Sequence, residues 1–175
     1  DDVVPYELMK LRLLNASHQS LAHWGRLLGF EFAHDAAADP DVAAFTRAYL
    51  EKEALETLLP VPGIDLPQYV DTLFERFTNA SIADTLARLA QDASDRMPKF
   101  VLPTVRDNLK ENRSIKLGAA MCAAWALGIE GKAEDGSEIV VDDQQGDRLV
   151  ALAARERDGK DTAVISDEAV FGELG

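Results

Sequence analysis

Three side chains that could do chemistry lie close together near the start of the chain, in the stretch YELMKLRLLNASHQSLAHWG (residues 6–25). They are the amine of Lys10, the carboxamide of Asn15 and the imidazole of His18. On an α-helix that advances about 100° per residue, with Lys10 at zero, Asn15 falls at about 140° and His18 at about 80°. All three share one side with several leucines, which predicts a sheltered polar cluster. A narrow strip on another side is predicted to face solvent, and it carries Arg12, Gln19 and His23.

Together these three side chains suit the oxidation of an alcohol. A lysine in a partly apolar site loses solvation of its charged form, so its neutral amine can accept a proton. The Asn15 amide could stabilise negative charge on an oxygen, and His18 could orient a hydroxyl. The spacing alone leaves a structural alternative open. In it, Lys10 extends to water, Asn15 bonds its own helix and His18 is a core histidine.

The elements that would position these residues are helices, because few segments alternate with a period of two. We therefore predict an all-α domain. Residues 33–41 and the Pro/Gly-rich residues 60–67 are predicted loops, and EIVV at 138–141 could be extended. The predicted helices span residues 6–28, 39–59, 67–79, a segment that begins near Ser81, a segment that restarts after Met97, residues 115–131 and residues 147–158.

Helix ends and faces are predicted from local signals. Asp39 with Pro40 is predicted to begin the second helix, and Ser114 to cap the helix of residues 115–131. Ser81 and Asp84 have capping-box spacing. Glu51, Glu53 and Glu56 are predicted to form a solvent-exposed helix face. A core position is predicted for Trp24, Trp125, Phe74, Phe77 and the lone cysteine, Cys122.

The composition excludes several classes of protein. The 175 residues are 47% hydrophobic with a net charge of −13, and no basic patch is present, so a nucleic-acid partner is not expected. The longest apolar run is about 13 residues, short of the roughly 20 that a membrane span needs. We expect a cytoplasmic protein with no membrane partner. The three histidines have no metal-ligand spacing and the lone cysteine has no partner, so no metal is expected. No Gly-rich phosphate loop is present, so the chain is not expected to hold a nucleotide by itself.

The sequence resembles the long-chain polyol dehydrogenase family, which includes the mannitol 2-dehydrogenases. KLRLLNASH (residues 10–18) is similar to that family's signature of a lysine, four residues, an asparagine, two residues and a histidine. Residues 60–107, PVPGIDLPQYVDTLFERFTNASIADTLARLAQDASDRMPKFVLPTVRD, look like the same family's C-terminal domain. The resemblance implies a multi-helical domain of the 6-phosphogluconate-dehydrogenase-like type.

For the site, the resemblance implies Lys10 as general base, Asn15 as half of an oxyanion hole and His18 as a partner of a substrate hydroxyl. Arg88 and Arg96 match substrate-binding positions, although the family commonly has lysine at the second. Without the resemblance, both arginines are better interpreted as solvated helix charges, with Asp84 as a surface partner.

The activity implied is a metal-independent, NAD- or NADP-dependent interconversion of a polyol and a ketose, such as D-mannitol and D-fructose. Residues 1–175 would be the helical substrate-binding and catalytic domain. The chain begins DDVVPYE, without a methionine. We therefore expect it to be a piece of a longer enzyme whose N-terminal Rossmann-like domain binds the cofactor, and we expect the piece alone to be inactive.

Two alternatives stay open at this point. One is a hexuronate (fructuronate) reductase, since related enzymes share the helix signature and a carboxylate substrate would need an additional basic contact. The other is a non-catalytic helical interaction module, in which Lys10, Asn15 and His18 are structural.

Overall fold

The fold is built around one long N-terminal rod. It consists of α1 (Val4–Met9), the π-helix η1 (Lys10–Asn15) and α2 (Ala16–Leu27). The computed structural model describes residues 3–157 and 163–172. The remaining helical elements are α3 (Ala33–Ala38), α4 (Pro40–Tyr49), the π-helix η2 (Leu50–Ala54), η3 (Leu55–Thr57), α5 (Leu66–Phe77), η4 (Ala80–Ile82), α6 (Leu86–Ala90), α7 (Ala93–Phe100), α8 (Leu102–Lys110), α9 (Lys116–Ile129), α10 (Gly146–Arg157) and α11 (Glu168–Phe171).

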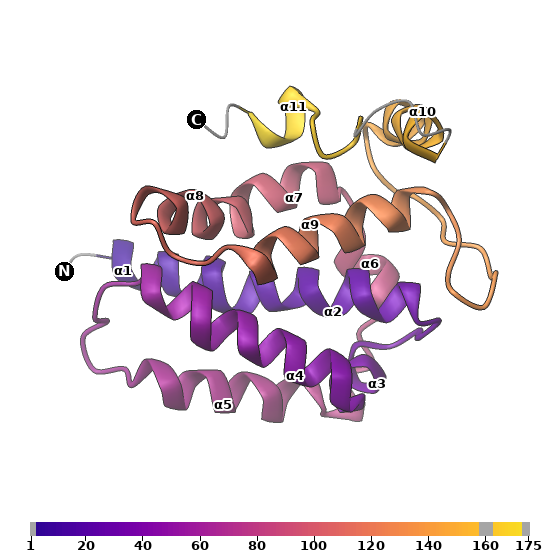
Figure 1. The fold of residues 1–175 in the computed structure, drawn as a ribbon. Helices are drawn as coiled ribbons and strands as arrows, with labels where there is room; N and C mark the ends of the chain where they lie inside the picture. Colours follow the sequence, from indigo (N-terminus) through magenta and orange to yellow (C-terminus); the bar gives the residue numbers. More distant parts are fainter. Residues whose placement is uncertain (1–2, 158–162, 173–175) are drawn as a thin grey trace.

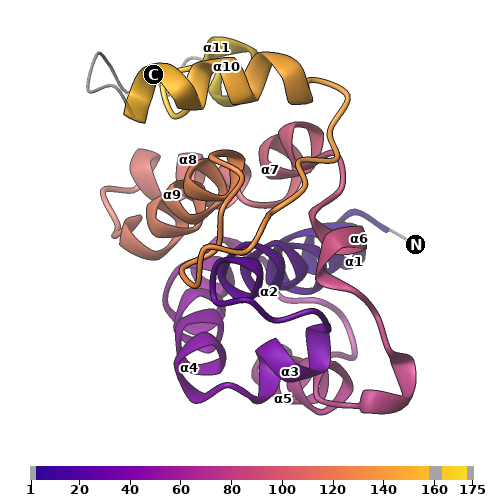
Figure 2. The same ribbon diagram turned by 90° about the vertical axis from the view of Figure 1, so that its right-hand side faces the viewer.

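The other helices lie on opposite sides of this rod. In Figures 1 and 2, α3, α4 and α5 lie on one side, and α7, α8 and α9 lie on the other. The helices α10 and α11 form an outer layer beyond α7, α8 and α9. Among the described residues no strand forms, and only two isolated bridges occur, Phe32 with Thr85 and Lys132 with Glu138. The predicted all-α fold is confirmed, while EIVV forms no strand.

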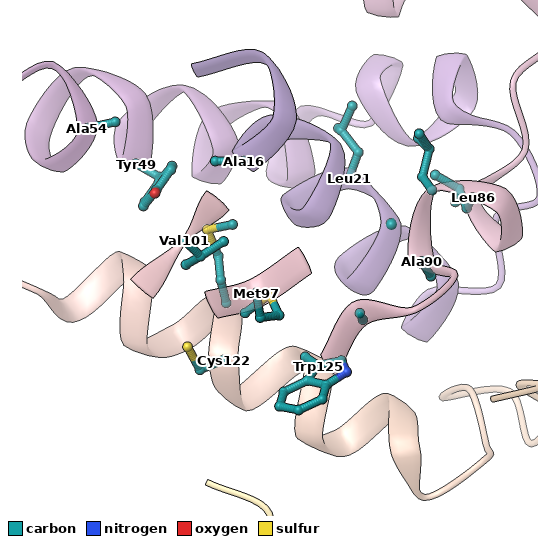
Figure 3. Packing of buried hydrophobic residues seen from close by; sticks show 14 of the residues in the cluster. Ala16, Leu21, Tyr49, Ala54, Leu86, Ala90, Met97, Val101, Cys122 and Trp125 are labelled. Atoms are coloured by element: carbon teal, nitrogen blue, oxygen red, sulfur yellow. The ribbon is translucent and has the colours of Figure 1, made fainter. Parts of the chain in front are cut away.

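The hydrophobic core surrounds the rod. Leu13 and Leu21 are fully buried, and each buried leucine contributes roughly 1.5–3 kcal/mol. Figure 3 shows Leu21 facing Leu86, and Met97 and Trp125 filling the space between α7 and α9. The residues predicted for the core are confirmed there: Trp125, Phe77 and Cys122 are buried, and Trp24 and Phe74 are half-buried against the same cluster.

A glycine allows α2 to approach two neighbouring helices. A Cβ atom at Gly25 would lie 2.6 Å from Cδ1 of Leu86 and 2.8 Å from Cβ of Ala36. Both distances are too short for carbon atoms, so a larger residue would push α3 and α6 away from the rod. This approach keeps α6, which carries Arg88, against the rod.

Some predicted helix ends are confirmed. The Asp39 carboxylate accepts hydrogen bonds from the backbone N–H groups of Asp41 and Val42, each at 3.0 Å, and Pro40 is the first helical residue. The loop of residues 60–67 also forms as predicted, up to the start of α5. These signals are local, and Asp and Pro act within the first turn that they begin.

Three predicted boundaries are wrong. Residues 33–38 form α3 instead of a loop, because the alanines there favour a helix and three of them are buried. Ser81 does not cap a helix, since Ala83 is left-handed and the Thr85 hydroxyl instead caps α6 by accepting the Arg88 N–H at 3.3 Å. α7 begins before Met97 because a distant carboxylate, Asp143, accepts the Ser94 N–H at 2.8 Å.

The strip of the rod that was predicted to face solvent is buried. Arg12 is 8% exposed, Gln19 is 1% exposed and His23 is 6% exposed. The prediction is wrong because helices also pack against this side of the rod, and backbone carbonyls of those neighbours accept a hydrogen bond from two of the polar side chains. Gln19 Nε2 donates to the Leu89 carbonyl at 3.0 Å, and Arg12 Nη1 donates to the Thr57 carbonyl at 3.2 Å.

The second helix was predicted to expose three glutamates to solvent, and this prediction is wrong for one of them. Glu51 and Glu56 are exposed, but Glu53 is only 1% exposed. Its carboxylate accepts the backbone N–H groups of Leu117 and Gly118 at 2.9 and 2.8 Å. Glu53 therefore caps the start of α9. The hydroxyl of Ser114, the predicted cap, accepts the Lys116 N–H at 3.3 Å and donates to the Glu53 carboxylate at 3.5 Å.

Candidate active site

Lys10 and Asn15 lie at the two ends of the π-helix η1. The Ala16 N–H bonds the Leu11 carbonyl, which is the i to i+5 pattern of a π-helix. In an α-helix, residues five apart are separated by about 140° around the axis, whereas the π pattern reduces this angle and stacks them more nearly one above the other. The widened turn thus turns Lys10 and Asn15 toward the same side of the rod.

The side chains of these two residues are open rather than sheltered. Lys10 is exposed and Asn15 is half-buried. Within the described ranges, neither side chain has a hydrogen-bond or ion-pair partner. The predicted sheltered cluster is therefore wrong for Lys10, because no other element in the described part of the chain covers that side of η1. Both groups are available to a ligand or to another domain.

His18 lines a cavity of about 150 Å³ on one side of the rod. Its ring lies 5.3 Å from that of Phe77. Burial lowers the pKa of His18 to about 4; Asp84 opposes this shift, and the charges of Arg88, Arg76 and Arg96 add to it. The imidazole is thus neutral near pH 7, with one nitrogen that donates and one that accepts. The cavity is lined by Leu14, His18, Ala33, His34, Arg76, Phe77, Asn79, Ile82 and Asp84.

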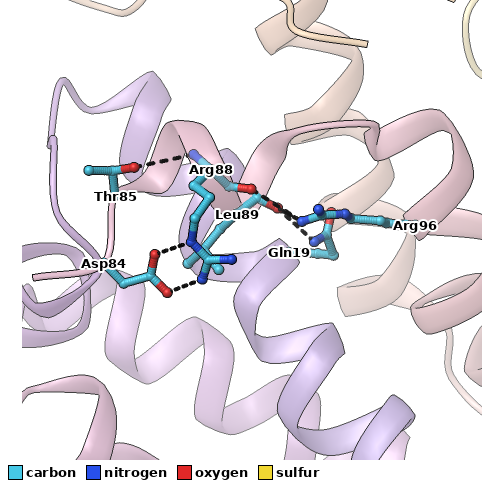
Figure 4. A network of polar contacts seen from close by, with 6 residues as sticks. All are labelled: Gln19, Asp84, Thr85, Arg88, Leu89 and Arg96. Carbon is cyan, nitrogen blue, oxygen red and sulfur yellow. Dashed lines mark hydrogen bonds and ion pairs between the residues drawn. The ribbon is translucent and has the colours of Figure 1, made fainter. Parts of the chain in front are cut away.

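Arg88 and Arg96 belong to one polar network beside this cavity (Figure 4). The exposed Arg88 guanidinium makes two hydrogen bonds with the Asp84 carboxylate, one of them from Nε to Oδ1 at 2.6 Å. The hydrogen bond to Arg88 lowers the pKa of Asp84 and raises that of Arg88. The pair interpreted from the i, i+4 spacing is therefore present.

Arg96 takes a different position, at the end of α6. Its Nη1 donates to the carbonyls of Arg88 at 3.2 Å and Leu89 at 2.9 Å. Gln19 donates to the same Leu89 carbonyl, so α6, α7 and the rod meet at this point (Figure 4). Arg96 holds the segment that carries Arg88, and it is half-buried rather than solvated.

Several cavity residues were not identified from the sequence. Arg76, Asn79 and His34 line the cavity with His18, and they come from α5, the turn after it and α3. No local pattern connects these segments, since only the packing of α3 and α5 against the rod brings them together. Among the polar cavity residues outside the rod, only Asp84 was indicated by the sequence, through its i, i+4 spacing to Arg88.

Within the part of the chain that the structure describes, no group of three or more His, Cys, Asp or Glu side chains could hold a metal ion. No helix in residues 3–157 or 163–172 is both long enough and apolar enough to cross a membrane.

The buried histidines make stability depend on pH. Burial and, to a smaller extent, the charge of Arg26 lower the pKa of His23 to about 3, while that of His18 is about 4. Histidine in an unfolded chain titrates near 6.5, so below that pH the unfolded chain binds more protons and stability falls. From pH 7 to pH 5 we expect each histidine to cost about 2 kcal/mol of unfolding free energy.

Urea unfolding at pH 7, 6 and 5 measures this loss, in a range where most carboxylates stay ionised. His23→Leu should lose about half of the pH dependence. An unchanged dependence in that variant would contradict the assignment to His23.

Residues 2–175 match the family described as mannitol dehydrogenase C-terminal domain. The chain belongs to this family. Mannitol dehydrogenase 2 of Saccharomyces cerevisiae is 37% identical over 161 residues, which cover 91% of this chain and 32% of the yeast protein. Mannitol 2-dehydrogenase of Aspergillus niger is 33% identical over 171 residues, which cover 98% of this chain and 35% of the fungal protein.

Solved structures agree with the family. The ternary complex of Pseudomonas fluorescens mannitol 2-dehydrogenase with NAD and D-mannitol matches with a TM-score of 0.94 and 38% identity, over 99% of this chain and 35% of that chain. A D-sorbitol dehydrogenase in substrate-free form matches with a TM-score of 0.87 and 28% identity, over 98% of this chain and 35% of that chain. The resemblance and the fold type predicted from the sequence are confirmed. This mannitol dehydrogenase C-terminal domain spans about a third of the length of the relatives it matches.

Proposed function

We propose that the chain is the helical catalytic domain of a polyol 2-dehydrogenase that interconverts D-mannitol and D-fructose. The observation that carries the proposal is the open π-helical turn beside the His18 cavity, which presents an amine and a carboxamide that have no partner among the described residues. An N-terminal Rossmann-like domain would close this site. The single buried Cys122 suits a reducing compartment, so we place the reaction in the cytoplasm.

In the proposed oxidation, Lys10 accepts the proton of the reacting hydroxyl as a general base. Asn15 donates its amide N–H to the oxygen as negative charge grows there, together with an asparagine of the other domain. The neutral His18 accepts a hydrogen bond from a neighbouring hydroxyl or donates one to it. Arg88, held by Asp84, donates to hydroxyls farther along the polyol. Arg96 supports Arg88 and is the weaker candidate for direct contact.

A bound NAD would supply the acceptor for the hydride that leaves the substrate carbon. This chain's residues fit the polyol side of such a site, since Lys10 and Asn15 are donors with no partner in residues 3–157 or 163–172, on a surface that a second domain can cover. The sequence of the chain has no Gly-rich phosphate loop, so the dinucleotide would be held mainly by the other domain. NAD rather than NADP is proposed because the structurally similar Pseudomonas enzyme is described as an NAD complex.

One observation favours the hexuronate reductase alternative. Arg76 lines the cavity, and the charges of Arg76, Arg88 and Arg96 all act on His18. One guanidinium group in the cavity lining, with two more near enough for their charges to act on His18, would suit a substrate carboxylate.

The test is a substrate panel on the full-length enzyme with both cofactors. The panel contains D-mannitol, D-arabinitol and D-sorbitol for oxidation and D-fructose and fructuronate for reduction. We expect the highest kcat/KM for D-mannitol and D-fructose with NAD or NADH. A preference for fructuronate would replace the proposal with the alternative, and appreciable turnover by residues 1–175 alone would contradict the shared site.

A further inference from the structure

We propose that Arg12 is a positioning residue for this reaction: it holds η1 in its π-helical form and so sets the relative placement of Lys10 and Asn15. The proposal rests on the proposed function. Arg12 does not face the open side of the rod, where Lys10 is exposed, and it acts through the backbone between the two site residues.

The contacts of Arg12 reach two separate parts of the fold. Its side chain is 10% exposed, and Nη2 lies 2.7 Å from Oδ2 of Asp107 on α8. Nη1 donates to the Thr57 carbonyl, at the end of η3, at 3.2 Å. One guanidinium thus ties the middle of η1 to two neighbouring elements at once.

These two partners are themselves held in place. The residue after Asp107 is the fully buried Asn108, whose Nδ2 donates to the Glu53 carbonyl at 3.0 Å. The Thr57 hydroxyl donates to the Ala54 carbonyl at 2.8 Å. α8, η2 and η3 therefore form a fixed frame against which Arg12 is anchored.

The π-helical turn needs such an anchor. π-helices are rare because their hydrogen-bond geometry is less favourable than that of an α-helix, and they persist where the surroundings hold them. On the open side, Lys10 and Asn15 have no partners among the described residues that could hold the turn. On the inner side, Leu13 is fully buried and Arg12 is paired. If η1 relaxed toward α-helical geometry, Lys10 and Asn15 would separate around the rod.

The test uses Arg12→Lys in the full-length enzyme, because lysine keeps the charge but lacks the two separate guanidinium NH₂ groups that contact the two partners. A displacement of about 1 Å in a catalytic group can cost about 100-fold in rate. We expect kcat for D-mannitol to fall roughly 10- to 100-fold, with KM changed less than about threefold. Arg47→Lys is the matched control. Arg47 also contacts two acceptor groups, the carboxylates of Asp71 at 2.7 Å and Glu51 at 3.3 Å, but it lies on α4.

A double-mutant cycle with Lys10→Ala separates positioning from general damage. If Arg12 acts through Lys10, Arg12→Lys should lower the residual rate of Lys10→Ala by much less than it lowers that of the wild type. Equal losses in both backgrounds, or a kcat like that of the Arg47→Lys control, would overturn the proposal.

A second variant covers the case in which Arg12→Lys does not fold, as judged by thermal unfolding. Asp107→Asn leaves the Thr57 contact in place, and we expect it to show a smaller loss of kcat with the same non-additivity. Additive losses in this variant would also overturn the proposal. Absence of polyol turnover in the wild-type enzyme would instead refute the proposed function, and the proposal for Arg12 with it.

Discussion

Lys10→Ala in the full-length enzyme should lower kcat for D-mannitol oxidation by about 10²- to 10⁴-fold, the usual contribution of a positioned general base. Lys10 lies on the open side of η1, and in the proposed reaction its amine accepts the proton of the substrate hydroxyl. KM should change little, because the proton moves mainly in the transition state. Steady-state rates as a function of D-mannitol concentration measure both quantities.

Two further measurements test the role of the amine itself. Small primary amines added to Lys10→Ala should restore part of the rate, because the space left by the side chain opens to solvent. Lys99→Ala is the matched control, since Lys99 is exposed and its amine lies 2.7 Å from the Asp95 carboxylate on α7. A nearly normal rate for Lys10→Ala, or a loss as large in Lys99→Ala, would refute the general-base assignment.

Glu53→Gln should produce the largest loss of stability, about 2–4 kcal/mol of unfolding free energy. The buried carboxylate accepts hydrogen bonds from the Leu117 and Gly118 N–H groups at 2.9 and 2.8 Å, at the positive end of the α9 dipole. An amide has only one accepting oxygen, so its NH₂ group would face one of these N–H donors. That N–H would then be buried without an acceptor.

Urea unfolding of the wild type and the variant measures this loss at pH 7. Glu51→Gln is the matched control, because Glu51 is exposed in the same π-helix and contacts only Arg47 in the described chain, at 3.3 Å. We expect that control to change stability by less than about 0.5 kcal/mol. Equal effects of the two substitutions would show that Glu53 does not support α9.

The same two residues show which parts of the fold were predictable. Glu51 and Glu53 look alike in the sequence, because each is a glutamate in a charged helical turn. The Asp39 cap and the loop of residues 60–67 were predicted correctly, since both depend on residues that act within one turn of themselves. The burial of Glu53 depends on the start of α9, more than sixty residues later, which no local pattern reports.

The candidate site divides in the same way. The order of Lys10, Asn15 and His18 and their resemblance to a family signature were readable from the chain, and so was the pairing of Arg88 with Asp84. The π-helical turn could not be read from the sequence, because the residue positions were predicted with α-helical spacing. The sequence also predicted the wrong exposure: Lys10 was expected to be sheltered and faces solvent, whereas Arg12 and Gln19 were expected to face solvent and are buried.

The sequence alone determined that this chain is helical, where most of its helices lie and which family its residues match, because hydrophobic periodicity, turn residues and motif spacing are properties of neighbours along the chain. The tertiary structure decided which polar side chains are buried and which remain available. That choice depends on the carbonyl, N–H and carboxylate groups that distant helices bring to each face of the rod.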